Sequence, residues 1–312
     1  MNIYQYPQTE KLNIDGCVLA LGFFDGVHYA HRDLFSTARR IADERGLAFG
    51  IFTFASDGNI KTGVRRLYDD REKAELFALC GADFTVYADF SKIAGLSPEE
   101  FVKKTLFSDL NCRVCVAGFN FKFGKGAAAD SAELSQLMSE VGGEAIIRDE
   151  ITDEGKTISA TLIRGLIEDG KITEANRLLG SPYYIKGRVL HGRRDGRKMG
   201  FPTANIPIGE GKIIPKRGVY RTATVIGDRI YSGVSNIGIC PTFDGDETRL
   251  ETHIIGYNGD LYGEQMRIYL LGYLREERRF NSIDELKMQI NIDKNKAIEE
   301  NGDITWQELG LK

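Results

Sequence analysis

Two of the chain's four histidines, His28 and His31, stand three residues apart directly after an apolar run and a glycine turn. The run, residues 17–24, has the length and composition of a strand buried on both faces. We expect the histidines to share one face of the first turn of the following helix. Free backbone N–H groups and the helix dipole make such a turn an anion site, where two imidazoles can stabilise charge developing on phosphorus. The residues expected beside a bound phosphate are Gly22, Asp25 and Gly26. The alternative is that two surface histidines happen to begin a helix.

A second candidate site is a loop between residues 187 and 205 that is rich in glycine and basic residues. Backbone N–H groups and cations of this kind can cradle a polyphosphate. Thr203 and Asn205 are two apart in a segment that Pro202 holds extended, so we expect their side chains to point the same way. Two neutral oxygens beside nucleotide phosphates suit Mg²⁺. The expected phosphate contacts in this loop are Gly192, Gly196, Arg197 and Gly200.

Glu251 lies in an apolar stretch that predicts a strand, residues 250–255. Alternation places Glu251 and His253 on one face of that strand and the apolar neighbours on the other. A carboxylate facing a packed surface is costly unless it is paired or has a function. An ordinary carboxylate on a solvated strand face remains the alternative at this point.

The elements that must position these groups change in kind along the chain. Up to about residue 180, apolar runs alternate with amphipathic stretches, which predicts a parallel sheet covered by helices. The expected strands are 17–24, 47–54, 84–87, 113–117 and 145–147. The expected helices are an amphipathic stretch over 34–42 that stops at Gly46, then 71–79, 98 onward, 132–138, 161–169 and 173–179.

After Gly180-Ser181-Pro182 short runs rich in β-branched and aromatic residues are separated by glycine turns, which favours an antiparallel barrel. Ser282 and Glu285 form a capping-box pattern that predicts a terminal helix. We therefore expect two domains, residues 1–182 and 183–312, the first α/β with a Rossmann-like parallel sheet and the second a β-barrel with a terminal helix.

Composition and charge exclude several classes of protein. Lys plus Arg number 41 against 45 Asp plus Glu, a net charge of −4, so we expect neither nucleic acid nor a membrane as partner. No apolar run approaches the roughly 20 residues that span a bilayer, and the first residues lack the pattern of a secretory signal. These features predict a cytoplasmic protein and leave a homo-oligomer open.

Two cysteines in a C-x-x-C pattern, Cys112 and Cys115, raise the question of a metal or redox pair. They lie in an apolar run that predicts a buried strand. Residues three apart on a regular strand point to opposite faces. We therefore expect both thiols to be small core residues.

The first candidate site resembles that of the nucleotidyltransferase superfamily, whose signature is a strand followed by H-x-G-H. The string G-F-F-D-G-V-H-Y-A-H is similar to the adenylyltransferase half of bacterial bifunctional FAD synthetases. Residues 118–124, G-F-N-F-K-F-G, resemble the family's flavin- and nucleotide-contacting loop, which assigns Asn120 to both ligands. Residues 158–164 resemble its S-S-T-x-x-R segment, which implies that Thr161 and Arg164 meet ATP phosphates.

The second half resembles riboflavin kinase over about residues 180–300. G-F-P-T-A-N, S-N-I-G-I-C-P-T-F, E-T-H, D-L-Y-G and L-R-E-E-R-R-F occur in family order. The resemblance implies that Thr203 and Asn205 hold Mg²⁺-ATP and that Glu251 is the general base on the riboflavin 5′-hydroxyl. It also implies that Arg275 lies near the flavin.

Together the resemblances imply a transferase with two steps: riboflavin and ATP give FMN, then FMN and a second ATP give FAD and pyrophosphate. A ribityl hydroxyl needs a base, whereas the FMN phosphate is already largely ionised at pH 7. Three departures from the family pattern, Ala30, Ala160 and the absence of an F-D-P-H-P-like turn after Phe54, support an alternative in which only the kinase works. An alternative of another class is a flavin-binding regulator without turnover.

Overall fold

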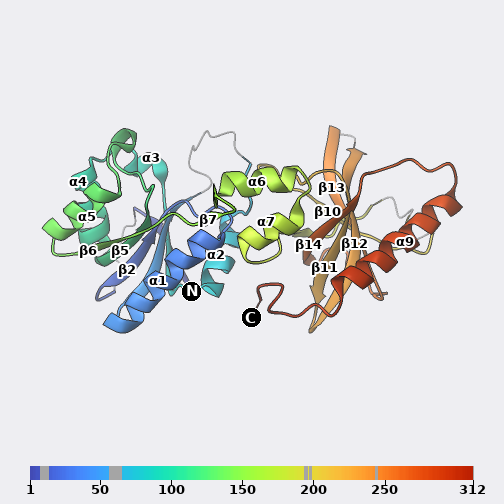
Figure 1. The fold of residues 1–312 in the computed structure, drawn as a ribbon, viewed down its shortest axis with the longest axis horizontal. Helices are drawn as coiled ribbons and strands as arrows, with labels where there is room; N and C mark the ends of the chain where they lie inside the picture. Colours follow the sequence, from blue (N-terminus) through green and yellow to red (C-terminus); the bar gives the residue numbers. More distant parts are fainter. Residues whose placement is uncertain (8–13, 56–64, 193–195, 197–198, 243–244, 312) are drawn as a thin grey trace. The chain divides into compact units, whose positions relative to one another are not determined.

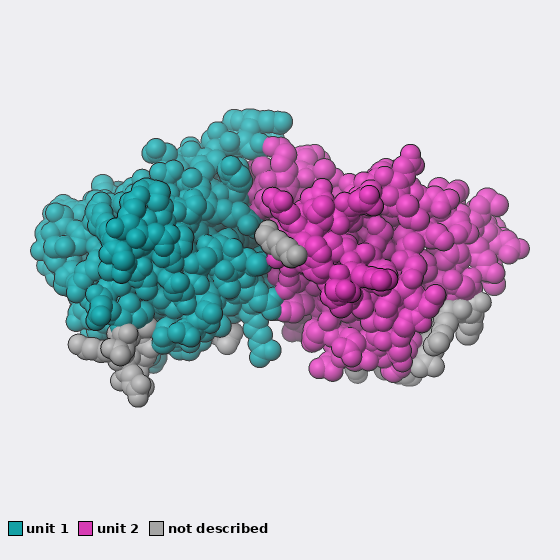
Figure 2. Space-filling view, turned by 90° about the horizontal axis from the view of Figure 1, so that it is seen from below, with its two compact units in different colours: residues 1–160 teal, residues 161–312 magenta. Residues whose placement is uncertain are grey.

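The structure is a computed structural model that describes residues 1–7, 14–55, 65–192, 196, 199–242 and 245–311. The chain divides into two compact units, Met1–Ala160 and Thr161–Lys312 (Figure 2). Each unit carries one six-stranded sheet.

Unit 1 is built on a parallel sheet that includes β2, β5 and β6 (Figure 1). Its strand order is β1-β4-β3-β2-β5-β6. Its strands are β1 (Asn2–Tyr6), β2 (Cys17–Leu21), β3 (Ala48–Phe54), β4 (Phe84–Ala88), β5 (Cys112–Gly118) and β6 (Glu144–Arg148). Every neighbouring pair is parallel. This confirms the Rossmann-like parallel sheet, in which ligands bind where the strand order reverses. Here that point is the carboxyl edge shared by β2 and β5.

The connections of unit 1 are mostly helical, as the alternation predicts. Its helices are α1 (Tyr29–Arg45), α2 (Asp70–Leu79), α3 (Phe90–Ile93), α4 (Pro98–Glu100), which continues as a π-helical segment (Phe101–Asp109), a 3₁₀ turn (Lys125–Ala127) and α5 (Ser131–Glu140); a small hairpin, β7 (Thr152–Asp153) and β8 (Lys156–Thr157), follows β6. The long helix α1 ends at Gly46, whose φ of 64° suits glycine.

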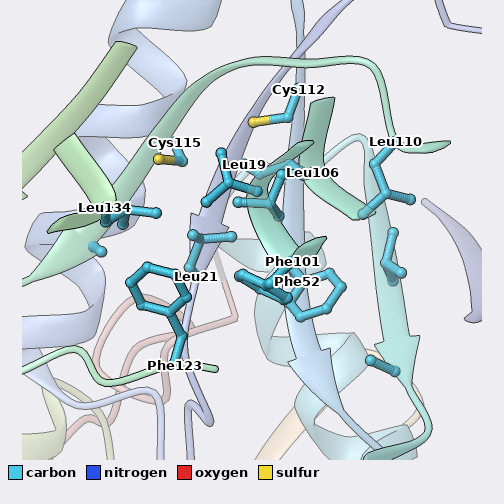
Figure 3. Close-up of a cluster of buried hydrophobic side chains, with 14 of the residues drawn as sticks. Leu19, Leu21, Phe52, Phe101, Leu106, Leu110, Cys112, Cys115, Phe123 and Leu134 are labelled. Carbon is cyan, nitrogen blue, oxygen red and sulfur yellow. The ribbon is translucent and has the colours of Figure 1, made fainter. Parts of the chain in front are cut away.

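The core beneath this sheet contains both cysteines of the C-x-x-C pattern (Figure 3). The prediction that they face opposite sides is wrong. The register shifts between Cys17 and Val18, so Cys112 pairs with Cys17 while Cys115 pairs with Leu19. This bulge adds one residue and brings both thiols to the same apolar face. Their expected role as core residues is confirmed, because both are fully buried.

Unit 2 is an antiparallel sheet that closes into a barrel. Its strands are β9 (Tyr184–Arg188), β10 (Ala204–Pro207), β11 (Gly218–Ile226), β12 (Arg229–Thr242), β13 (Gly245–Ile254) and β14 (Gln265–Arg275), in the order β10-β13-β12-β11-β14-β9. The two edge strands meet where the Leu190 N–H donates to the Asn205 carbonyl at 2.8 Å. The terminal helix α9 (Ile283–Asn301) is capped by Ser282, whose hydroxyl accepts from the Glu285 N–H. The Glu285 carboxylate accepts from the Asn281 N–H rather than from that of Ser282, so only half of the predicted capping box forms.

Two short helices, α6 (Ala160–Glu168) and α7 (Ile172–Leu179), lie between the sheets in sequence. The compact units divide after Ala160, the first residue of α6, whereas the sequence predicts a domain boundary near residue 182. The side chain of Asn176 on α7 donates to the Leu270 carbonyl of β14 and accepts from the Tyr183 N–H. These bonds tie α7 to the barrel, which explains why the helix belongs to the same compact unit.

Two details of unit 1 differ from the sequence prediction. The first strand of the sheet, β1, is missing from the prediction because its five residues are mostly exposed and show no apolar run. Strand β2 ends at Leu21 rather than at Phe24, since the backbone of Phe24 turns to a φ of 50°. Over the described ranges, no helix is long and apolar enough to cross a membrane.

Candidate functional sites

The loop between β2 and α1 runs from Gly22 to His28 at the carboxyl edge of the sheet. Phe24 and Val27 adopt positive φ angles of 50° and 46°, which are costly for residues with a side chain. The surrounding contacts hold this conformation: the Thr53 hydroxyl donates to the Phe23 carbonyl, and the Asp25 carboxylate accepts from the Leu67 N–H. Asp25 is therefore a buried brace of the loop.

His28 and His31 stack on each other at the start of α1, as their spacing predicts. The ring centroids are 3.5 Å apart and the planes differ by 20°. Neither Nδ1 atom has a hydrogen-bond partner among the described residues, although both are buried. The side chain of His28 caps no N–H of α1 in the described structure, so the first turn of this helix retains donors for a ligand. The arrangement can donate hydrogen bonds to a phosphate from two imidazoles and the backbone.

Burial controls the charge of the two imidazoles. It lowers the pKa of His28 to about 4. It lowers the pKa of His31 well below its usual value, and the positive charges of His28 and Lys73 lower it further. In the absence of an anion both rings are therefore neutral at pH 7, and a bound phosphate would favour their protonation.

Asn120 lies at the same edge, two residues beyond the end of β5, and its side chain is exposed. Since β2 and β5 are neighbours in the sheet, Asn120 and the β2–α1 loop flank the point of strand-order reversal. Thr161 and Arg164 share one turn of α6 and are joined by a bond of 3.0 Å from the guanidinium to the hydroxyl. They belong to unit 2, so their place beside the histidines stays a prediction.

An aromatic cluster that the sequence analysis missed follows the carboxyl ends of β2, β3 and β4. The rings of Phe23 and Phe54 stack at 6.5 Å, and Phe90 meets Phe54 edge to face at 5.5 Å. Phe23 and Phe90 remain 37% and 41% exposed. The three phenylalanines are far apart in sequence, and only the parallel sheet brings them to one edge.

The second site is a cavity of about 360 Å³ at the end of the barrel. Gly192, Thr203 and Asn205 line it together with Tyr257 and Tyr262, and their contacts with phosphate and Mg²⁺ stay predictions. The amide nitrogen of Asn205 lies 3.2 Å from the Thr203 hydroxyl, so the two side chains do point the same way. His253 holds the segment in place, because its Nδ1 lies 3.0 Å from the Pro202 carbonyl oxygen.

Of the other predicted phosphate contacts of this loop, Arg197 lies outside the described residues, whereas Gly196 and Gly200 are described. Gly196 accepts backbone bonds from Met199 and Phe201, and a Cβ on Gly196 would lie 2.4 Å from the Phe201 carbonyl oxygen. Gly200 has a φ of 89°. Glycine is therefore required at both positions by the loop's own backbone.

Strand register pairs Glu251 with a residue of the cavity wall, Asn205, whereas β13 itself lines the cavity with Thr252 and Ile254. Glu251 of β13 pairs with Asn205 of β10 on one side and with Asn236 of β12 on the other. Directly opposed residues on one face have Cβ atoms about 5 Å apart. Leu250, Thr252 and Ile254 face the buried interior, so the predicted alternation is confirmed. Register thus puts Glu251 and Asn205 on the same face of neighbouring strands.

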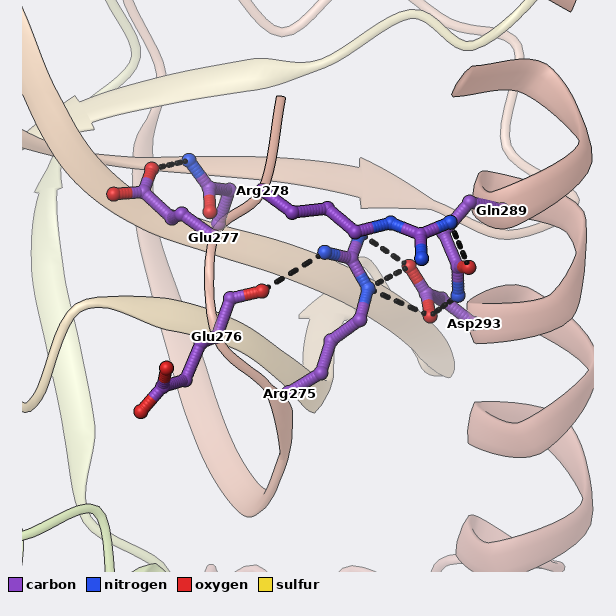
Figure 4. Close-up of polar contacts among 7 residues, drawn as sticks. Arg275, Glu276, Glu277, Arg278, Gln289 and Asp293 are labelled. Carbon is purple, nitrogen blue, oxygen red and sulfur yellow. Dashed lines mark hydrogen bonds and ion pairs between the residues drawn. The ribbon is translucent and has the colours of Figure 1, made fainter. Parts of the chain in front are cut away.

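The same row continues across the barrel to Arg275. Asn236 pairs with Val219, and Val219 pairs with Arg275. The Arg275 guanidinium binds both carboxylate oxygens of Asp293 on α9 at 2.8–3.1 Å (Figure 4). Gln289 also donates to Asp293. Arg275 thus fastens α9 to the face that carries Glu251, and its contact with flavin stays a prediction.

The residues present fit a magnesium-nucleotide better than a metal bound by the protein alone. The described residues contain no group of three or more His, Cys, Asp or Glu side chains that could hold a metal. The hydroxyl of Thr203 and the amide of Asn205 offer two neutral oxygens at the cavity wall. Mg²⁺ bound to nucleotide phosphates needs few protein ligands.

Comparisons with known proteins cover both units. The FAD synthetase family model matches residues 10–162 and the riboflavin kinase family model matches residues 179–300. The bifunctional riboflavin kinase/FMN adenylyltransferase of Bacillus subtilis is 34% identical over 90% of this chain and 91% of its own length. Those of Listeria monocytogenes and Escherichia coli K12 are 36% and 35% identical, over 88% and 94% of this chain and 90% and 93% of theirs. The chain belongs to the bifunctional riboflavin kinase/FMN adenylyltransferase family.

A solved structure shares the fold of this chain over nearly its whole length. A Streptococcus pneumoniae chain whose title calls it a macrolide-efflux protein superposes with a TM-score of 0.86 at 30% identity. The superposition covers 96% of this chain and 99% of that one. The bifunctional riboflavin kinase/FMN adenylyltransferase family is thus supported by sequence, and the two-unit fold recurs in a second protein.

Several residues of this family member escape prediction from sequence because their neighbours come from distant strands. Asn236 beside Glu251, Asp293 beside Arg275 and the tyrosines of the cavity are examples. Two sequence strings could have pointed to Asn236 and Tyr262: S-N-I-G contains the first and D-L-Y-G the second. Both strings resemble the family, but they assign no role to the single side chain.

Proposed function

We propose that this protein phosphorylates riboflavin to FMN in unit 2 and transfers an adenylyl group from ATP to FMN at the histidine site of unit 1. The observation that carries the proposal is the register of the barrel, which sets Glu251 beside Asn205. A carboxylate next to a nucleotide-holding pair is suited to take a proton from an alcohol that attacks the γ-phosphate.

In the kinase step, Glu251 accepts the proton of the riboflavin 5′-hydroxyl as that oxygen bonds to the γ-phosphorus and ADP leaves. Thr203 and Asn205 hold Mg²⁺-ATP, and the glycine loop, including Gly192, surrounds the phosphates. Bound Mg²⁺ supplies charge neutralisation on the phosphates. A positioned base contributes about 10²–10⁴-fold to such a step.

In the adenylyl step, an FMN phosphate oxygen attacks the α-phosphorus of ATP and pyrophosphate leaves. The nucleophile is ionised, so the site needs alignment and donors rather than a base. His28, His31 and the first turn of α1 provide donors, and Thr161 and Arg164 bind the ATP phosphates. The flavin ring stacks near Phe23, Phe54 and Phe90, whose exposed faces lie at the same sheet edge, with Asn120 on the opposite side of the reversal point.

The functional boundary that we propose is near residue 182, because the helix with Thr161 and Arg164 serves the adenylyl site. The family models leave residues 163–178 between their matches. Substrates are the small molecules riboflavin, FMN and ATP. We further propose a cytoplasmic protein that binds neither nucleic acid nor membranes; a homo-oligomer is compatible with these sites.

The relatives favour two activities over a kinase alone and over a flavin-binding regulator. Ala30 lies in the first turn of α1 and Ala160 begins α6, while residues 56–58 of the expected turn fall outside the described residues. A direct assay separates the alternatives. We expect FMN, ATP and Mg²⁺ to give FAD and pyrophosphate, and riboflavin and ATP to give FMN. Loss of FAD formation alone in His31→Ala supports the bifunctional enzyme; wild-type protein that forms FMN but no FAD would be a kinase only.

A further inference from the structure

Lys73 is a lysine buried beneath the adenylyl site that the reaction described above does not use. It lies in the first turns of α2, where Asp69 and Glu72 form a reciprocal capping box that fixes the start of the helix. Only 1% of the residue is exposed. A buried ammonium is costly, so its surroundings show what it does.

Groups from four segments surround the ammonium of Lys73. On its own helix, an Asp70 carboxylate oxygen lies 3.3 Å from Nζ. From the β2–α1 loop, the ring of Phe23 lies 5.2 Å from Nζ, and from β4 the ring of Tyr87 lies at 5.5 Å. Two further charges shift the pKa of Lys73: the Asp25 carboxylate, in the same loop, raises it, and the Arg66 guanidinium, before α2, lowers it. The ammonium therefore touches the loop that precedes the histidines.

The charge of Lys73 reaches the histidine pair as well. Burial lowers the pKa of Lys73, while the carboxylates of Asp70 and Asp25 raise it. The positive charge of Lys73 in turn lowers the pKa of His31. An apolar side chain of similar length would fill this space without the cost of burying a charge. A role that needs the charge explains why a lysine is there.

We propose that Lys73 is a positioning residue for adenylyl transfer: its buried ammonium holds the Gly22–His28 loop through Phe23 and Asp25 and places a positive charge behind the phosphate that the loop binds. The inference rests on the proposed adenylyl transfer in unit 1. The ligand that this positive charge would stabilise is the negatively charged phosphate chain of ATP. The alternative is that the Lys73–Asp70 pair only stabilises α2.

The test compares Lys73→Met with Lys92→Met, an exposed lysine on α3 of the same unit. We expect Lys73→Met to lower kcat/KM for FAD formation at least 10-fold, mainly through a higher KM for ATP, and Lys92→Met to leave it unchanged. Riboflavin phosphorylation by the same molecules reports on unit 2 and should not change. Lys73→Arg keeps the charge and should retain more activity than Lys73→Met.

A second readout separates a structural role from the proposed one. Since Lys73 lowers the pKa of His31, Lys73→Met should raise the pKa of that imidazole, measured by NMR in the protein without substrates. Folded Lys73→Met protein with the wild-type KM for ATP would overturn the inference. An equal loss of kcat/KM for FAD formation in Lys73→Met and Lys73→Arg would also overturn it. If Lys73→Met does not fold, Lys73→Gln, which also removes the charge, carries the same expectation. Wild-type protein that forms no FAD would refute the proposed adenylyl transfer itself.

Discussion

At the scale of single residues, the two sites differ because their nucleophiles differ. A ribityl alcohol must lose a proton to attack phosphorus, and we propose that Glu251, which pairs with Asn205 across two strands, accepts it. An FMN phosphate is already ionised, and the unit 1 site offers two neutral imidazoles and helix donors instead. One buried carboxylate of unit 1, that of Asp25, accepts from the Leu67 N–H and braces the loop. The chemistry of each nucleophile thus matches the side chains around it.

Glu251→Gln should abolish the proton acceptor while keeping the shape of the side chain. We expect kcat for FMN formation to fall about 10²–10⁴-fold, with FAD formation from supplied FMN unchanged. The measurement is product formation in the two assays, with the exposed Glu264→Gln as control. Wild-type kinase activity in Glu251→Gln would remove this carboxylate from the mechanism.

The buried histidines should make unit 1 less stable in acid. With its pKa lowered to about 4 when folded and near 6.5 when unfolded, His28 binds a proton more readily in the unfolded chain. The free energy of unfolding is therefore highest above pH 6.5 and falls as the pH drops toward 4. His28 contributes up to about 1.4 kcal/mol of this loss per pH unit. Urea unfolding followed by circular dichroism between pH 4.5 and 7.5 tests this, and His28→Gln should flatten the slope. An equal slope in both proteins would contradict the assignment.

At the scale of elements, helix α9 is tied to the barrel face that carries Glu251. Arg275 and Asp293 provide the central pair, while Arg221 contacts Glu300 and Asn301 near the end of the helix. Apolar contact comes from Ala297, which packs with Val219 and Val234. The helix therefore completes the surface beside the proposed base, and its loss should affect one activity only.

Asp293→Ala should leave the Arg275 guanidinium without its carboxylate. Removing one partner of a buried pair costs about 3–5 kcal/mol; we expect about 2 kcal/mol here, because the Arg275 side chain is 22% exposed. Riboflavin phosphorylation should weaken while adenylyl transfer persists. Denaturation monitored by the single tryptophan, Trp306 of unit 2, measures the loss. The exposed Glu299→Ala on the same helix is the control, and equal stability of the two variants would show that the pair contributes nothing.

At the scale of the whole molecule, the central groups proposed for each activity lie on a different sheet. The histidine pair depends on the parallel sheet of unit 1, and the Asn205–Glu251–Asn236 row depends on the barrel of unit 2. FMN is the product of one site and the substrate of the other. Inactivating one site should therefore leave the other at work.

Mixing two inactivated proteins tests this independence. Glu251→Gln should turn FMN, but not riboflavin, into FAD, and His31→Ala should stop at FMN. An equimolar mixture should make FAD from riboflavin, since FMN can leave one molecule and bind another. Chromatography of the flavins over time measures the three species. A mixture in which FMN stays bound to His31→Ala and no FAD forms, although Glu251→Gln still converts added FMN, would show that FMN must pass within one molecule.

The sequence by itself determined the local features: the alternation of strands and helices, the glycine end of α1, the Ser282 cap, the extended Thr203–Asn205 segment and the two faces of the Glu251 strand. These follow from backbone preferences and from side-chain periods within a few residues. Only the tertiary structure decided which strand lies beside which. Register joined Glu251 to Asn205 and Asn236, a bulge turned Cys112 and Cys115 to one face, and packing buried Lys73 under Phe23. Such contacts join residues far apart in the chain, and their energies depend on pairing and burial that no local pattern contains.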